Sequence, residues 1–408
     1  MSFPGVDVVI PVFNRIELLR YTLQSLFNQS YKMWRLLIVD DGSQEDVRSV
    51  IIPFNDLRIC VIRQMNQGNA IARNTGIYQG LNKYVICLDS DDVWHPEMLY
   101  TTVTFLETHP EVDVVYTQVQ SIDDKGKPLP RPIGPQPREG DLLEPLLMGM
   151  PILPSSVLAR RRCFEQWGAY TPGLDDWELW LRWAARGCRF ACIEQPLLYY
   201  RIHSQNFNLD WERRRETHFR MLDAFFALDN LPEVAYRLRE RAYANQHFYF
   251  AILAGQVDRL EDALSEFTSA VLRHPLYLDD LDFYTRIACV HQGRIDAGTE
   301  RGLDLRLAET TVLQALAGLF KASDLPAGLK TRRGRAYAMA YLALARLAYG
   351  VVHEMRLARH YLWQAWRCYP ALTWRTDWVL WLARAAIGYN TLQRIKHILR
   401  FGVEYAHS

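Results

Sequence analysis

The 408-residue sequence lacks several signals that would define its class at once. It carries 47 Lys and Arg against 46 Asp and Glu, so it has no excess of basic charge of the kind that favours nucleic-acid binding. It contains neither GxGxxG nor GxxxxGK[ST], which disfavours a Rossmann dinucleotide site and a P-loop. Its seven cysteines include no CxxC pair, so we expect reduced thiols rather than a zinc site or a disulfide framework.

Long apolar runs are also missing. The most apolar late stretch, residues 336–352, is interrupted by Arg346, so no membrane span is expected. The first residues, MSFPGVDVVIPVFN, lack a basic segment followed by a long apolar one, which predicts no signal peptide and a cytoplasmic location. With 49% apolar residues, the chain can bury a sizeable core, and its length predicts two or three domains.

The first 120 residues alternate between strand and helix patterns. Continuous apolar runs such as WRLLIVD are typical of strands buried on both faces of a sheet. Strands separated by helices of about ten residues predict an α/β fold with a mostly parallel sheet flanked by helices. The predicted strands are 6–12, 34–40, 57–63, 84–88 and 112–119, and the predicted helices are 17–28, 69–79 and 96–108.

The pattern changes further along the chain. Residues 123–140 carry five prolines and are predicted to form a surface loop or flap. Residues 151–160, 190–193 and 197–201 are predicted strands, and residues 175–186 a helix. Strand signals fade after residue 210, which predicts an α/β domain over 1–210 and an all-α domain over 211–408.

A faint repeat occurs in the helical half. RAYA stands at residues 241–244 and again at 335–338, and each copy is followed by a proline, Pro275 and Pro370 respectively. The spacing resembles tetratricopeptide repeats, although a full helix-pair consensus is absent. A helical bundle with accidental similarity is the alternative.

Acidic residues gather where predicted strands end. The fourth strand runs into Asp89-Ser90-Asp91-Asp92. Carboxylates that lie close together repel one another unless a cation lies between them, so this turn indicates Mg²⁺ or Mn²⁺ with substrate phosphates as further ligands. The alternative is an acidic turn that caps the helix beginning near Pro96.

Further polar residues are predicted at the same edge of the sheet. Asp41 ends the second strand and could accept hydrogen bonds from a base N–H, or form an Asx turn within DGS. Arg73 begins a helix there and could meet negative charge, or pair structurally with one of the acids. Asp175 is a candidate N-cap, while Asp176 could act as a general base. His203 follows a short strand, as a metal ligand or an ordinary structural histidine.

Taken together, these motifs resemble family 2 glycosyltransferases of the GT-A fold. The matching strings are VVIPVFNR, LLIVDDGS, NQGNAIARNTGI, LDSDDVWHPEML, PSSVLARRRCFEQWGAY, LDDWELWLRWAARG and LLYYRIHSQN, which cover roughly residues 5–207. The resemblance implies a nucleotide-diphosphate sugar donor, a divalent cation (Mn²⁺ or Mg²⁺) and inversion at the anomeric carbon.

The resemblance also implies residue roles. Pro11 and Asp41 would line the nucleoside pocket, Asp89 would approach the ribose, and Asp92 would support the acidic turn of the DXD motif. Asp91 would hold the metal, with His203 as a second ligand. Asp176 would be the catalytic base; Asp175 stands where the family usually has a glutamate.

The predicted function is therefore transfer of a sugar, with a UDP-sugar as the favoured donor, to a glycan, lipid-linked or protein acceptor, as in polysaccharide biosynthesis. The alternative is a non-catalytic scaffold with a vestigial GT-A domain and partner-binding helical repeats. The helical half is open to a protein partner, to homo-oligomerisation, or to peripheral contact with the inner face of the membrane through basic residues 394–400. No nucleic-acid partner is expected.

Overall fold

The computed structural model describes residues 4–133, 138–174, 176–203, 211–257, 259–290, 303–322 and 325–371. The chain packs as two compact units, Met1–Ala242 and Tyr243–Ser408. Helix α9 (Glu233–Gln256) begins in the first unit and ends in the second. The predicted domain limit at residue 210 concerns the end of the sheet-bearing domain and stays a prediction.

The first unit is built on a mixed sheet with the strand order β3-β2-β1-β4-β8-β6-β9-β5, and β7 pairs with β6. The pairings among β3, β2, β1 and β4 are parallel, whereas β8 runs antiparallel to both β4 and β6. The strands are β1 (Val6–Val12), β2 (Trp34–Asp40), β3 (Ile59–Arg63), β4 (Tyr84–Cys87), β5 (Val93–Trp94), β6 (Val114–Ile122), β7 (Pro128–Ile133), β8 (Val157–Arg160) and β9 (Phe190–Arg201).

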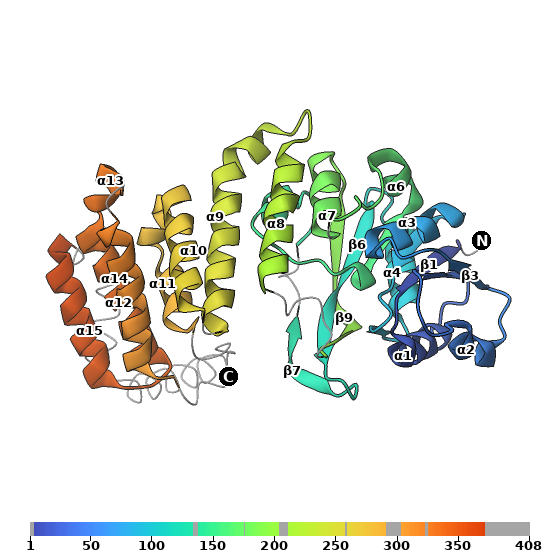
Figure 1. Cartoon of the computed structure of the whole chain (residues 1–408), viewed down its shortest axis with the longest axis horizontal. Coiled ribbons are helices and arrows are strands. Elements are labelled where there is room, and N and C mark those ends of the chain that lie inside the picture. The colour runs from blue at the N-terminus through green and yellow to red at the C-terminus, as the bar shows by residue number, and fades with distance from the viewer. Residues whose placement is uncertain are drawn as a thin grey trace, which may run out of the picture. The chain divides into compact units, whose positions relative to one another are not determined.

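Helices cover both faces of this sheet. Figure 1 shows α1 and α2 on one side of the parallel strands and α3 and α6 on the other. The sides of α1, α2 and α3 follow from right-handed β-α-β crossovers. From β1 to β3 successive strands are added in one direction along the sheet, and β4 is then added on the other side of β1, so α3 lies on the opposite face from α1 and α2. The helices of this unit are α1 (Ile16–Phe27), α2 (Arg48–Ile51), α3 (Asn69–Gln79), α4 (Met98–Thr108), α5 (Leu143–Leu147), α6 (Arg161–Trp167), α7 (Asp176–Ala185) and α8 (Trp211–Phe226).

Strand β1 lies at the centre of the core, and every one of its residues is buried. On one face Val8 and Ile10 join an apolar cluster with Leu19 and Leu23 of α1. On the other face Val9 packs against Gly76 of α3, which leaves no room there for a larger residue. Burial on both faces is why the predicted limits of β1 and β2 agree with the structure.

The segment 123–140 was predicted to be a loop, and this prediction is partly wrong. Residues 128–133 form strand β7, which pairs antiparallel with β6. Proline has no N–H to donate and is therefore tolerated in an edge strand, where one side of the backbone needs no partner. The two short strands predicted at 190–193 and 197–201 are likewise one strand, β9, with irregular register around Gln118 of β6.

The second unit is helical throughout its described residues, as predicted. Its helices after α9 are α10 (Leu260–Arg273), α11 (Leu281–Ala288), α12 (Leu305–Lys321), α13 (Ala327–Lys330), α14 (Arg333–Gly350) and α15 (Met355–Cys368). The two RAYA copies lie in α9 and α14. Helix α10 ends two residues before Pro275, and α15 ends two residues before Pro370. The likeness to tetratricopeptide repeats stays a prediction, and the basic residues 394–400 lie outside the described residues.

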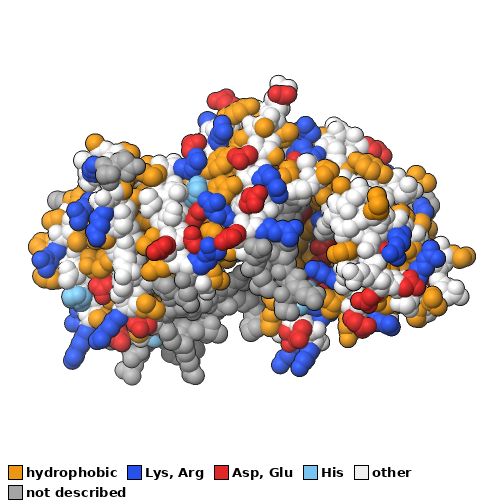
Figure 2. All heavy atoms as spheres, viewed as in Figure 1, with side chains coloured by type: hydrophobic (Ala, Val, Ile, Leu, Met, Phe, Trp, Pro, Cys, Tyr) orange, Lys and Arg blue, Asp and Glu red, His pale blue; other side chains and the backbone are white. Residues whose placement is uncertain are grey.

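No helix in the described part of the chain is long and apolar enough to cross a membrane. On the face drawn in Figure 2, basic and acidic side chains are interspersed, in keeping with the net charge of +1.

Candidate functional site

The site lies where strands β1 and β4 separate. Because the chain continues from β1 to β2 on one side and returns to β4 on the other, this is the switch point at which open α/β sheets bind ligands. Pairing of β1 with β4 ends at Val9 and Cys87. Pro11 comes two residues later, so its missing N–H would point toward β4 beyond the last pair, and no ladder hydrogen bond is lost.

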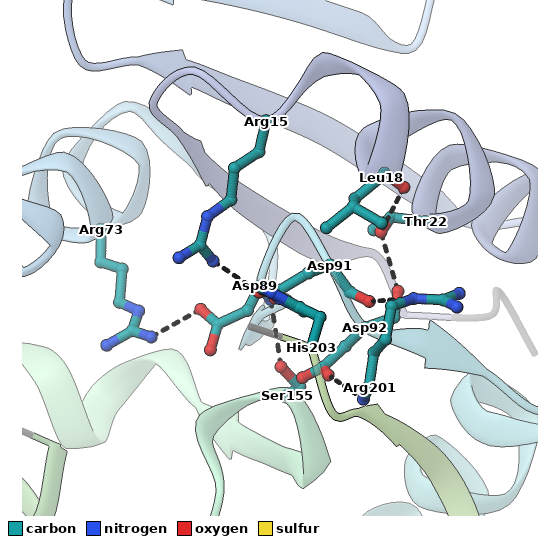
Figure 3. Close-up of polar contacts among 10 residues, drawn as sticks. All are labelled: Arg15, Leu18, Thr22, Arg73, Asp89, Asp91, Asp92, Ser155, Arg201 and His203. Carbon is teal, nitrogen blue, oxygen red and sulfur yellow. Dashed lines mark hydrogen bonds and ion pairs between the residues drawn. The ribbon is translucent and has the colours of Figure 1, made fainter. Parts of the chain in front are cut away.

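The acidic turn after β4 does not gather its carboxylates at one point. Asp89 accepts a hydrogen bond from Arg73 (2.6 Å), and Asp91 accepts one from Arg15 (2.5 Å). Asp92 turns the other way, toward the backbone N–H of Arg201 (3.3 Å). Figure 3 shows these separate directions. The three acids of this turn are therefore individually partnered, and the divalent cation predicted at the turn stays a prediction.

Asp91 is the point where distant segments meet. Its Oδ2 atom lies 3.0 Å from Nε2 of His203 and 2.5 Å from Nη1 of Arg15 (Figure 3). His203 follows β9, which runs beside β6, whereas Arg15 follows β1. The structure thus brings together the two residues predicted as metal ligands, which stand 112 positions apart in the sequence.

Asp92 is buried beneath this turn. Burial, reinforced by the charges of Asp91 and Asp89, holds its pKa well above the usual value. The backbone carbonyl of Asp92 accepts a hydrogen bond from Thr22 of α1 (2.8 Å). The supporting role of Asp92 in the acidic turn stays a prediction.

Asp41 is held by three donors at the end of β2. Oδ1 accepts hydrogen bonds from the side chain of Gln64 (2.8 Å) and the N–H of Gln67 (2.9 Å), and Oδ2 accepts one from the N–H of Gly68 (2.8 Å). The Asx-type contact in the DGS turn belongs to Asp40, whose Oδ1 accepts from the N–H of Ser43 (2.8 Å). Asp41 is therefore fixed as an acceptor at the edge of the sheet, and a carboxylate retains further lone pairs for a ligand N–H.

Arg73 joins the acidic turn to a second part of the site. Its guanidinium pairs with Asp89 and lies over the ring of Tyr170, with the centroid 5.1 Å away. Burial alone would lower the pKa of Arg73, but nearby negative groups, Asp89 foremost, outweigh burial and raise it. The ion pair with Asp89 is the structural alternative considered for Arg73, yet its buried Nε atom has no hydrogen-bond partner in the described structure.

Asp176 is the first residue of α7 and is half-buried. Its charge contributes to raising the pKa values of both Arg73 and Tyr170, which places it near the Arg73 side of the site. Glu178, two residues on, faces away and pairs with Arg182 (2.7 Å). Asp175 lies outside the described residues.

Sequence reasoning missed Arg15, Ser155 and Arg201. Arg201 is buried, and its guanidinium donates to the carbonyls of Asp91 (3.1 Å) and Asp124 (3.0 Å). Ser155 Oγ accepts from the N–H of Asp89 (3.0 Å). All three residues lie within motifs that carry the family resemblance: Arg15 in VVIPVFNR, Ser155 in PSSVLARRRCFEQWGAY and Arg201 in LLYYRIHSQN. Their place in these motifs is the signal that could have identified them.

The side chains of Asp91 and His203 fit a divalent cation that takes its other ligands from a substrate. Among the described residues, no three His, Cys, Asp or Glu side chains converge on one point. Asp91 and His203 supply one carboxylate oxygen and one imidazole nitrogen, and a cation of the Mg²⁺ or Mn²⁺ type commonly takes its remaining ligands from substrate phosphates and water.

Comparison with known proteins agrees with this geometry. Residues 7–166 match the family model described as "Glycosyl transferase family 2". Among solved structures, residues 1–349 of S. aureus TarS in complex with UDP-GlcNAc match with a TM-score of 0.52 and 17% identity over 81% of this chain and 90% of that one. A mannosyltransferase of Pyrobaculum calidifontis, in complex with GDP-Man and Mn²⁺, matches with a TM-score of 0.50 and 16% identity over 85% of this chain and 87% of that one.

Curated relatives are named as glycosyltransferases. An uncharacterized glycosyltransferase of Rickettsia bellii is 32% identical over 206 residues, which make up 49% of this chain and 29% of that protein. An uncharacterized glycosyltransferase of Methanocaldococcus jannaschii is 26% identical over 222 residues, or 50% of this chain and 73% of that protein. The chain spans only 20–29% of the first three Rickettsia relatives that it matches.

The first unit therefore has the GT-A fold. Residues 7–166 within it are similar to glycosyltransferase family 2.

Proposed function

We propose that the protein is a metal-dependent, inverting glycosyltransferase that moves a sugar from a nucleotide-diphosphate donor to an acceptor hydroxyl. The observation that carries this proposal is the convergence of Asp91, His203 and Arg15 at the β1–β4 switch point. Two carboxylates with other partners lie on either side: Asp41 follows β2 and Asp89 follows β4, the two strands that pair with β1.

In this proposal each residue has a separate task. Asp41, fixed by backbone N–H groups, accepts a hydrogen bond from the nucleobase, beside Pro11. Asp89 faces the ribose, and Arg73 holds Asp89 in place. Asp91 and His203 hold Mn²⁺ or Mg²⁺, which when bound stabilises negative charge on the departing diphosphate.

Asp176 takes the proton from the acceptor hydroxyl as the new C–O bond forms. An alkyl hydroxyl has a high pKa, so a positioned base is commonly worth about 10²–10⁴ in rate. A single displacement from the opposite face of the sugar inverts the anomeric carbon and requires no covalent intermediate.

For the donor and the acceptor we propose classes of molecule. The TarS neighbour binds UDP-GlcNAc and the mannosyltransferase neighbour binds GDP-Man, so a nucleotide-sugar donor is supported, and we favour a UDP-sugar. A glycan, a lipid-linked sugar and a protein all offer the required hydroxyl. The seven free cysteines suit a reducing compartment such as the cytoplasm.

The first test is binding of UDP, GDP, dTDP and CDP to the full chain, measured by calorimetry with and without Mn²⁺. We expect one nucleotide to bind only with the metal, and its binding to disappear in Asp91→Ala. Absence of binding to all four nucleotides, together with no donor hydrolysis, would support the non-catalytic scaffold instead.

The second test separates catalysis from binding. Asp176→Asn is nearly isosteric but cannot accept the proton, so kcat should fall about 10²–10⁴-fold while nucleotide affinity is retained. Normal sugar transfer by folded Asp176→Asn would remove Asp176 from the mechanism.

A further inference from the structure

The side-chain amide of Asn74 in α3 makes two hydrogen bonds to the backbone of one distant residue, Tyr170. Its Nδ2 donates to the carbonyl of Tyr170 (2.7 Å), and its Oδ1 accepts from the N–H of Tyr170 (2.9 Å). The two residues stand 96 positions apart. One amide therefore satisfies both polar groups of one peptide residue, as a neighbouring strand would.

Tyr170 belongs to the segment that leads into α7 and Asp176. The start of this segment is held from α7 itself, because Arg182 donates to the carbonyls of Gly168 (3.2 Å) and Ala169 (2.7 Å). The hydroxyl of Thr171 donates to Glu178 of α7 (2.9 Å). These bonds fasten the segment to α7, whereas the two hydrogen bonds of Asn74 join it to α3.

Helix α3 also reaches the acidic turn. Arg73, the residue before Asn74, bonds Asp89 and lies over the Tyr170 ring. Two consecutive residues of α3 thus connect the turn that carries Asp89 and Asp91 with the segment that carries Asp176. Asn74 itself is half-buried, and both ends of its amide are occupied by Tyr170.

We propose that Asn74 is a positioning residue: by clamping Tyr170 to α3, it fixes where the Asp176 carboxylate stands relative to the donor bound at Asp89 and Asp91. This inference rests on the proposed glycosyltransferase function. A displacement of about 1 Å in a catalytic group can cost on the order of 100-fold in rate, although binding of the donor is unaffected.

The test compares full-length Asn74→Ala with the wild type in sugar transfer. We expect kcat to fall about 10–100-fold, while KM for the donor and the calorimetric Kd of the nucleotide change less than about twofold. The matched control is Asn82→Ala, because Asn82 is another half-buried side-chain amide that donates at 2.7 Å, to Asp7, away from the site. The control should lose far less activity.

The variant Asn74→Asp keeps the acceptor for the Tyr170 N–H but places a carboxylate oxygen against the Tyr170 carbonyl, so kcat should fall at least as far as in Asn74→Ala. It replaces Asn74→Ala in the test if Asn74→Ala is poorly folded. A loss in Asn74→Ala no larger than in Asn82→Ala would overturn the proposal. So would a parallel loss of nucleotide affinity, which would place Asn74 in donor binding or in general stability.

Hydrogen exchange separates failure of this inference from failure of the proposed function. Amides of residues 168–174 and 176 should exchange faster in Asn74→Ala than in the wild type, whatever the reaction is. Unchanged exchange there would overturn the clamp even if the enzyme is active. Absence of sugar transfer in the wild type, with faster exchange in the variant, would overturn the glycosyltransferase assignment and the catalytic role of Asn74, and leave the clamp as a structural contact.

Discussion

At the scale of single residues, each carboxylate of the acidic turn, Asp89, Asp91 and Asp92, has a different partner. Asp89 meets a buried guanidinium, Asp91 meets His203 and Arg15, and Asp92 lies in a buried position with a raised pKa. Three acids in one short turn would repel one another if they all faced the same point. Their separation leaves Asp91, flanked by a histidine and an arginine, as the acid best placed to exchange a protein partner for a cation.

The contact between His203 and Asp91 predicts the behaviour of His203→Ala. The variant should need at least about tenfold more Mn²⁺ than the wild type for half-maximal stabilisation by the nucleotide, because one of the two proposed protein ligands is lost. A thermal-shift titration with Mn²⁺ measures this. His109→Ala, at the end of α4, is the control, and equal Mn²⁺ requirements in both variants would exclude His203 as a ligand.

The cysteines predict a second result at this scale. Burial raises the pKa of Cys87 to about 12 and that of Cys289 to about 12, so at pH 8 only about one molecule in 10⁴ carries either thiolate. Cys60 is only half-buried. Alkylation of the native protein at pH 8, followed by peptide mass spectrometry, should modify Cys60 first and leave Cys87 and Cys289 unmodified; rapid labelling of Cys87 would contradict its burial.

At the scale of elements, close packing of α3 on β1 places the site. Gly76 lies directly over Val9, and a Cβ atom at position 76 would stand 2.4 Å from Cγ1 of Val9. Arg73 and Asn74 lie three and two residues earlier on the same helix. The close approach of α3 to β1 at Gly76 therefore positions Arg73 to reach Asp89 and Asn74 to reach Tyr170.

This packing predicts that Gly76→Ala destabilises the protein by about 1–3 kcal/mol, because the added methyl group forces Val9 or the helix to move. Combining it with Val9→Ala should cost less than the sum of the two single changes, since the smaller side chain makes room for the methyl group. Urea denaturation of the three variants measures the difference. Strict additivity would show that the two residues do not compete for space.

At the scale of the whole molecule, the two units have separate apolar cores. One core gathers β1, β2, β4 and the helices α1 and α4, and the other gathers helices α9 to α15. The two clusters share no residue. Stability in each unit should therefore respond mainly to its own substitutions.

Gly318 in α12 offers the test, because a Cβ atom there meets nothing within 4 Å. Gly318→Ala should stabilise its helix by about 0.5–1 kcal/mol. Hydrogen exchange should slow in α12 and its neighbours and stay unchanged in β1 and β2, whereas Gly76→Ala should have the opposite distribution. A change in the sheet caused by Gly318→Ala would indicate that the two cores are coupled.

The sequence by itself determined the elements whose signals are local. The limits of β1, β2 and α3 follow from apolar patterns within each segment, and the acids that follow the strands could be located for the same reason. Only the tertiary structure decided which partner each acid takes, that residues 128–133 form an edge strand, and that Asn74 grips Tyr170. Those contacts join residues that are far apart in the chain, and no local pattern specifies a distant partner, because the packing of the whole unit fixes the pairing.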